Sequence, residues 1–88
     1  MKWVVYILRC GRGELYTGVT SNLGRRLVEH QTGIGGWFTS TSQPIELAYH
    51  ETYSTKADAT RREVQLKGWT RRKKLALIAG DLKALKQT

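Results

Sequence analysis

The chain has 88 residues with 15 Lys and Arg against seven Asp and Glu, so its formal net charge is +8, and 40% of the residues are hydrophobic. This length allows one domain, spanning residues 1–88, with one modest core. The single cysteine, Cys10, excludes an intrachain disulfide, and the two histidines do not have zinc-finger spacing. A lone thiol without a signal peptide is typical of a cytoplasmic protein.

Local composition and periodicity predict three strands and three helices. In chain order these are strands over residues 3–9 and 14–20, a helix from about 23 to 30, a strand over 45–53, and helices over about 56–67 and 71–82. The order ββαβαα predicts an α/β fold of the α+β type, with a three-stranded, mainly antiparallel sheet flanked by helices. The apolar residues of the third strand have one parity and are expected on one face: Ile45, Leu47, Tyr49 and Tyr53.

Side chains that can cap a helix precede each predicted helix. Thr55, with Asp58 three residues later, has the capping-box pattern. Gly80 can interrupt the last helix. The candidate caps are Ser21 or Asn22 for the first helix, Thr55 for the second and Thr70 for the third.

The charge indicates the class of partner. A strongly basic surface attracts polyanions, and nucleic acid is the commonest of these. Residues 4–8, the longest apolar run, are too few to cross a bilayer, and binding to lipid headgroups usually needs a basic amphipathic helix. We therefore expect a nucleic-acid partner with no membrane association, and we favour a monomer. A basic surface with no such partner is the alternative.

Tyr6 and Tyr16 lie on the two strands of the predicted hairpin, ten residues apart. An odd number of residues in the connecting loop would place both side chains on one face of the sheet. We predict a three- or five-residue loop around Gly11 and a shared face. Alternatively, these tyrosines are strand-forming residues that serve packing alone.

Arg26 and His30 lie on or beside the inward stripe of the first predicted helix. A guanidinium held against a small domain is costly unless it meets an acid or an anionic ligand. The alternatives are that Arg26 lies at the edge of the stripe and pairs with Glu29 or Glu51, and that His30 is a polar residue at the helix end.

Glu63 is the only acid in a strongly basic segment. A carboxylate surrounded by cations stays ionised and can hold a divalent cation; the alternative is an i, i+4 pair with Lys67. Trp69 can stack on a base, but a core position is the favoured interpretation. The density of cations favours phosphate contacts over a merely solvated face. The predicted nucleic-acid-binding residues are Arg25, Arg61, Arg62, Lys67, Arg71, Arg72, Lys73 and Lys74.

Three short motifs occur in a fixed order: Val5-Tyr6-Ile7, then Tyr16-Thr17-Gly18, then Arg26. Together they resemble the GIY-YIG nuclease pattern, and Glu63 lies where that family places its metal-binding glutamate. The resemblance is to the small stand-alone bacterial members and covers nearly the whole chain.

The resemblance implies a DNA endonuclease, with a possible place in DNA repair, that hydrolyses phosphodiester bonds using one divalent cation, Mg²⁺ or Mn²⁺. By matching positions, Tyr6 and Tyr16 flank the scissile phosphate, and Tyr16 is the more usual choice to help deprotonate water. Arg26 would neutralise the phosphate, Glu63 would hold the metal, and His30 would assist nearby. A free tyrosine has a pKa of about 10, which a nearby cation lowers.

Some positions depart from the family pattern. Val5 and Thr17 replace the first Gly and the Ile of the motifs, and Val19 stands where many members carry a lysine that helps to activate the nucleophile. Residues 37–43 lack the cations of relatives, and Leu75 lies where some have asparagine. These departures keep two alternatives open: a nucleic-acid-binding module that has lost the chemistry, and an interaction domain of a DNA-repair complex that binds an acidic partner.

The nuclease interpretation makes a geometric prediction. Arg26, Glu63 and both tyrosines should converge on one pocket, with gaps of roughly 5–9 Å in the apo protein. If Glu63 lies on the far side of the sheet from Tyr16, this nuclease mechanism fails and the binding module becomes the better account.

Overall fold

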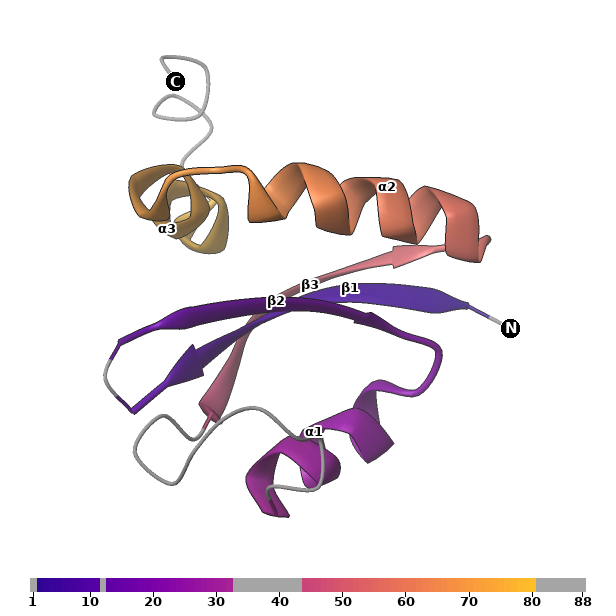
Figure 1. Cartoon of the computed structure of the whole chain (residues 1–88), viewed down its shortest axis with the longest axis horizontal. Helices are drawn as coiled ribbons and strands as arrows, with labels where there is room; N and C mark the ends of the chain where they lie inside the picture. The colour runs from indigo at the N-terminus through magenta and orange to yellow at the C-terminus, as the bar shows by residue number, and fades with distance from the viewer. Residues whose placement is uncertain (1, 12, 33–43, 81–88) are drawn as a thin grey trace.

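A computed structural model describes residues 2–11, 13–32 and 44–80, without the side chains of residues 30–32 and 44–45. The order ββαβαα is confirmed (Figure 1). The elements are β1 (Trp3–Cys10), β2 (Leu15–Thr20), α1 (Leu23–Thr32), β3 (Pro44–Tyr53), α2 (Lys56–Lys67) and α3 (Arg71–Ala79). None of these helices has the length and apolar content that crossing a bilayer requires.

The three strands form one antiparallel sheet in the order β2-β1-β3, so β1 is central and β2 and β3 are its edges. Helices α2 and α3 cover one face of this sheet, and α1 lies on the other face (Figure 1). The predicted α+β class, with a three-stranded antiparallel sheet flanked by helices, is confirmed. The two faces of the sheet therefore meet different helices.

The face under α2 and α3 carries a tightly packed apolar cluster. Val5 of β1 and Ala59 and Leu66 of α2 are fully buried there. Burying a side chain as large as Leu66 contributes about 1.5–3 kcal/mol. Trp69 packs against this cluster, so its interpretation as a core residue is confirmed. Its ring also lies against two cations, Arg62 at 5.1 Å and Lys73 at 4.3 Å from the ring centroid.

The helix ends follow the predicted capping pattern. In each helix a side-chain oxygen accepts the backbone N–H three residues later, which satisfies one exposed donor of the first turn. The accepting residues are Asn22, Thr55 and Thr70. Helix α3 ends at Ala79 because Gly80 takes the left-handed conformation, with φ of 72°. Leu82, which the predicted stripe included, lies outside the described residues.

A bulge in β3 overturns one prediction. Ile7 of β1 pairs with Tyr49, whereas the next residue, Leu8, pairs with Leu47. The extra residue in β3 therefore places Leu47 and Tyr49 on opposite faces, and the expected common face is wrong. The side chain of Ile45 lies outside what the structure describes. Alternation alone cannot reveal a bulge, because the bulge breaks the period of two without changing the composition.

Candidate active site

Tyr6 and Tyr16 project from the same face of the hairpin, as predicted. The register pairs Tyr6 with Gly18 and Leu8 with Tyr16, so the two tyrosines are diagonal neighbours. Their ring centroids are 6.2 Å apart, and the ring planes make an angle of 48°. This is the face opposite the Val5 cluster, and it is the face on which α1 lies (Figure 1).

The hairpin turn differs in detail from the prediction. The strand bounds leave four residues, 11–14, between β1 and β2, and the register is centred on residue 12 rather than on Gly11. The Cys10 N–H donates to the Glu14 carbonyl at 2.8 Å, so three residues separate this pair and the parity of the tyrosines is kept. A hairpin register centred on residue 11 would pair the two tyrosines directly. Because the register is centred on residue 12, they are diagonal neighbours.

Gly18 allows Tyr6 to reach across the edge strand. A Cβ atom at position 18 would lie only 2.4 Å from the Tyr6 hydroxyl oxygen and 2.5 Å from its Cζ. No side chain fits in this space, so glycine lets the ring of Tyr6 lie over β2. In the sequence Gly18 stands out only as part of the Tyr16-Thr17-Gly18 motif. The register would have identified its role, because it places Tyr6 directly opposite this glycine.

The environment of Tyr6 keeps its hydroxyl protonated. The side chain is 1% exposed, and burial, followed by the neighbouring Tyr16, raises the pKa of Tyr6 far above its ordinary value. The charge of Arg26 acts in the opposite direction and lowers this pKa, but it does not outweigh burial. The expectation that a nearby cation makes a tyrosine a better base is therefore wrong for Tyr6. At neutral pH Tyr6 is suited to donate a hydrogen bond.

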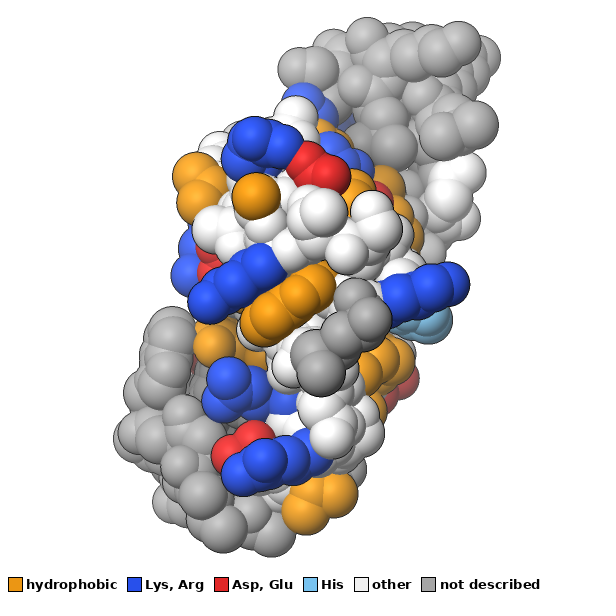
Figure 2. All heavy atoms as spheres, turned by 90° about the vertical axis from the view of Figure 1, so that its right-hand side faces the viewer, with side chains coloured by type: hydrophobic (Ala, Val, Ile, Leu, Met, Phe, Trp, Pro, Cys, Tyr) orange, Lys and Arg blue, Asp and Glu red, His pale blue; other side chains and the backbone are white. Residues whose placement is uncertain are grey.

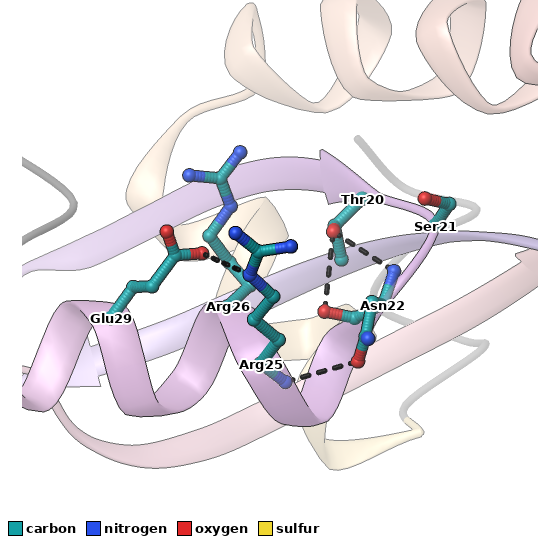
Figure 3. Close-up of a pocket in the computed structure, with 6 residues that line it drawn as sticks. All are labelled: Thr20, Ser21, Asn22, Arg25, Arg26 and Glu29. Carbon is teal, nitrogen blue, oxygen red and sulfur yellow. Dashed lines mark hydrogen bonds and ion pairs between the residues drawn. The ribbon is translucent and has the colours of Figure 1, made fainter.

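Arg26 lines a pocket of about 260 Å³ between the end of β2 and the start of α1 (Figure 3). In Figure 3 its guanidinium and that of Arg25 extend from α1 in the same general direction, and Arg25 lies beside Glu29 with Nε and Oε1 4.0 Å apart. Arg25 also lines this pocket, so both arginines face the same space. The residues that form its wall are Thr20, Ser21, Asn22, Arg25, Arg26 and Glu29. Two guanidinium groups against one carboxylate make the pocket attractive to an anion.

Glu63 lies on α2, on the side of the helix that faces β2. The buried stripe of α2 runs through Ala59 and Leu66, and Arg62 and Glu63 flank it on opposite sides. Arg62 reaches Glu51 on β3, with Nε and Oε1 2.9 Å apart, so Glu63 lies toward the other edge of the sheet. The Glu63 side chain is 14% exposed, and its Oε2 accepts from Lys67 Nζ at 2.9 Å. The alternative of an i, i+4 pair is confirmed.

The predicted convergence on one pocket is wrong, and with it the single-pocket mechanism; the observed arrangement is the one expected to favour the binding module. Helices α1 and α2 cover opposite faces of the sheet, so Tyr16 and Arg26 lie on one side and Glu63 on the other (Figure 1). Tyr16 and Arg26 on one side and Glu63 on the other all lie near strand β2. Among the described strands, β2 has no partner on its outer side. A site that includes Glu63 must therefore lie around the outer edge of β2.

The basic residues of α2 and α3 are largely engaged within the molecule. Arg62 is the clearest correction to the predicted nucleic-acid surface, because its 22% exposed side chain is held by Glu51 and lies over Trp69. Figure 2 views the side with the N-terminus and the start of α2, where basic side chains are spread out and some lie beside acidic ones. The other intramolecular contacts are Arg61 with Asp58, Lys67 with Glu63, Arg71 with the Gly13 carbonyl, and Lys73 with Trp69. Apart from Arg62, the predicted phosphate-contacting residues stay a prediction, because an ion pair at an exposed side chain does not prevent contact with a phosphate.

A second pair of tyrosines surrounds Glu51 on the face that α2 covers. Tyr49 and Tyr53 both donate to its carboxylate, and Arg62 donates to both oxygens, at 2.9 and 3.1 Å. Burial alone would raise the pKa of Glu51, but these hydrogen bonds outweigh burial and hold the pKa below its ordinary value. Arg62 is therefore the arginine that pairs with Glu51, whereas the alternative considered from the sequence was Arg26.

A metal ion would have one protein ligand here. No group of three or more His, Cys, Asp or Glu is placed to hold a metal among the residues that the structure describes, and the side chain of His30 is not among these. Glu63 alone is compatible with Mg²⁺ or Mn²⁺, because such ions are often held by one carboxylate with water and phosphate oxygens. Glu63 must then exchange Lys67 for the ion.

Comparison with known proteins agrees with this geometry. Residues 2–76 match the family model of the GIY-YIG catalytic domain. The chain is 43% identical to a UPF0213 protein of Staphylococcus epidermidis over 77 residues, which cover 88% of this chain and 94% of that protein. It is 45% identical to a UPF0213 protein of Bacillus pumilus over 69 residues, covering 78% and 70% respectively.

The solution NMR structure of a UPF0213 protein from Bacillus halodurans has the same fold, with a TM-score of 0.60 and 36% identity. The superposition covers 92% of this chain and 86% of that one. The two diagonal tyrosines, the glycine beneath Tyr6 and the arginine of α1 therefore lie in a matched catalytic-domain fold. The chain belongs to the GIY-YIG family, among its small UPF0213 members.

Proposed function

We propose that this protein is a metal-dependent DNA endonuclease whose active site lies around the outer edge of β2. The observation that carries the proposal is the passage of Tyr6 over Gly18, which brings its hydroxyl onto the edge strand beside Tyr16. Arg26 lies on the same face and is near enough to influence the pKa of Tyr6. Two phenols and a guanidinium beside an anion-attracting pocket suit a phosphodiester.

Each residue has a distinct role in this proposal. Arg26 stabilises the charge that develops on the phosphate as water attacks phosphorus and the sugar oxygen leaves. Tyr6, which stays protonated and is almost wholly buried, donates a hydrogen bond to Tyr16 and orients it. Tyr16, acting as the phenolate, takes the proton of the attacking water, the sugar oxygen that leaves takes up a proton from solvent, and His30 of α1 is proposed as an auxiliary group. Glu63 would hold Mg²⁺ or Mn²⁺, which when bound neutralises phosphate charge and lowers the pKa of water.

A cleavage assay tests this function. Circular duplex DNA, single-stranded DNA and RNA are incubated with the protein and Mg²⁺ or Mn²⁺, with EDTA as a control. We expect metal-dependent cleavage, greater on DNA than on RNA, that is lost in Arg26→Ala and in Glu63→Ala while the urea unfolding midpoint of both variants stays near that of the wild type. Cleavage that persists in EDTA and in Glu63→Ala would mean that a contaminating nuclease is responsible.

A second candidate function is a nucleic-acid-binding module without chemistry. Two observations favour it: Glu63 lies on the far side of the sheet from Tyr16, and its carboxylate already has Lys67 as a partner. Val19, which replaces a lysine of other members, packs against the apolar cluster. Salt-sensitive DNA binding without cleavage of any substrate, unchanged by Glu63→Ala, would establish the module and exclude the nuclease.

A further inference from the structure

The contact between Glu63 and Lys67 joins the proposed metal ligand to a cation of the same helix. Lys67 Nζ lies 2.9 Å from Glu63 Oε2. The Glu63 side chain is 14% exposed and that of Lys67 is 49% exposed, so the carboxylate is largely sheltered while the lysine reaches in from solvent. A sheltered carboxylate is costly without a counter-charge, and Lys67 supplies it.

We propose that Lys67 is an exchangeable counter-ion, which a divalent cation must displace from Glu63 and which thereby sets the affinity of the site for metal. This inference rests on the proposed function, because it takes Glu63 as the metal ligand. An ammonium group and a divalent cation repel each other strongly at a separation of a few ångströms, so they compete for one carboxylate.

Arg62 and Lys67, two basic side chains of α2, differ in how easily each can move away from its acidic partner. Arg62 donates to Glu51 through two nitrogens and to Gln65 through a third, which fixes its guanidinium. Lys67 has one ion-pair contact, to Glu63, through a single flexible stem that is half exposed. An ammonium on such a stem can swing into solvent without any shift of α2. Of the two, Lys67 is therefore the side chain that a divalent cation can displace.

Displacement has a consequence for DNA binding. Once it has left Glu63, the ammonium remains tethered close to the same carboxylate and can contact a phosphate oxygen of bound DNA. When the Lys67 ammonium binds a phosphate of DNA, it no longer competes with the metal ion for Glu63. By linkage, DNA binding should strengthen metal binding, and metal binding should strengthen DNA binding by the same factor.

The test measures Mn²⁺ binding directly, by the EPR signal of free Mn²⁺, on the full chain. Lys67→Gln removes the competitor, and Lys74→Gln on α3 is the matched control, because it removes the same charge from a lysine that does not contact Glu63. We expect Lys67→Gln to bind Mn²⁺ about threefold to tenfold more tightly than the wild type. Lys74→Gln should change the affinity by less than about twofold. Lys67→Arg, which keeps the charge, should bind no more tightly than the wild type.

The outcomes separate this inference from the proposed function. Equal tightening in Lys67→Gln and Lys74→Gln would show that total charge, not the Glu63 contact, controls affinity, and would overturn the inference while leaving the nuclease intact. Unchanged Mn²⁺ binding in Glu63→Gln would show that the metal does not bind at Glu63, and the proposed function would fail. A short phosphorothioate-protected DNA should tighten Mn²⁺ binding in the wild type more than in Lys67→Gln, and equal tightening would contradict the linkage.

Discussion

The two faces of the sheet use the same residue types for different purposes. Under α2, two tyrosines and Arg62 surround Glu51, and every one of these contacts is a direct hydrogen bond. On the face of α1, two tyrosines and Arg26 lie near an open pocket, where Arg25 Nε and Glu29 Oε1 are 4.0 Å apart. The tyrosines and arginine that hydrogen-bond Glu51 contribute to stability. The tyrosines and arginine beside the pocket can contribute to binding an external anion.

The largest expected effect is on the core of the α2 face. Leu66→Ala removes a fully buried side chain and should lower the free energy of unfolding by about 2–5 kcal/mol, through lost burial and a residual cavity. Val28→Ala, at a site on α1 that is 59% exposed, is the control and should change it by less than about 0.5 kcal/mol. Urea unfolding measures both. Equal losses would show that stability is shared evenly between the two faces.

The two arginines sharpen the comparison further. Arg62→Met leaves the carboxylate of Glu51 without its main partner and should lower the free energy of unfolding by about 1–3 kcal/mol. Arg26→Met should cost less than about 0.5 kcal/mol and remove DNA cleavage. Urea unfolding and the cleavage assay, run on both variants, check this. A destabilised Arg26→Met protein would place Arg26 in the structural set.

Gly18 of the edge strand β2 affects both stability and the proposed cleavage activity. In Gly18→Ala the new methyl group would overlap the Tyr6 hydroxyl, so the ring must move, at a cost of about 1–3 kcal/mol and with loss of cleavage. Gly24→Ala on α1, whose Cβ would meet Asn22 Oδ1 at 3.9 Å, is the control and should stabilise the protein by about 0.5–1 kcal/mol. Full cleavage activity in Gly18→Ala would exclude a role for the position of Tyr6.

The smallest expected effect is on the pH dependence of stability. Because hydrogen bonds hold the pKa of Glu51 in the folded protein below its ordinary value of 4.5, its contribution is fully present above about pH 4.5 and is lost as the pH falls through the folded pKa. The free energy of unfolding of the wild type should therefore fall more steeply below pH 4.5 than that of Glu51→Gln. An equal slope in Glu51→Gln would contradict the assignment.

Much of the fold could be predicted from the sequence because the signals are local. The caps at Asn22, Thr55 and Thr70 depend on side chains within three residues of each helix start, and the shared face of Tyr6 and Tyr16 depends on parity within one hairpin. The bulge in β3 has no such local signal, since it is fixed by pairing with a strand that is distant in sequence.

The arrangement of the site was less predictable for the same reason. Whether Glu63 lies on the face of Tyr16 depends on how α1 and α2 pack on the sheet, which spacing along the chain does not determine. Which arginine pairs with Glu51 likewise depends on the side of the sheet that each helix covers. The rise in the pKa of Tyr6 comes from burial, and charge alone suggested the opposite direction.

In the proposed nuclease, residues from both faces of the sheet act on one site around the edge of β2. A double-mutant cycle on kcat/KM for DNA cleavage tests it, using Arg26→Lys and Glu63→Asp, which should each reduce the rate partially. If both side chains act on the same phosphate, the double variant should lose less than the product of the two single losses, with a coupling of about 0.5–3 kcal/mol. Losses that multiply without coupling would contradict a shared site and place Arg26 and Glu63 in separate functions.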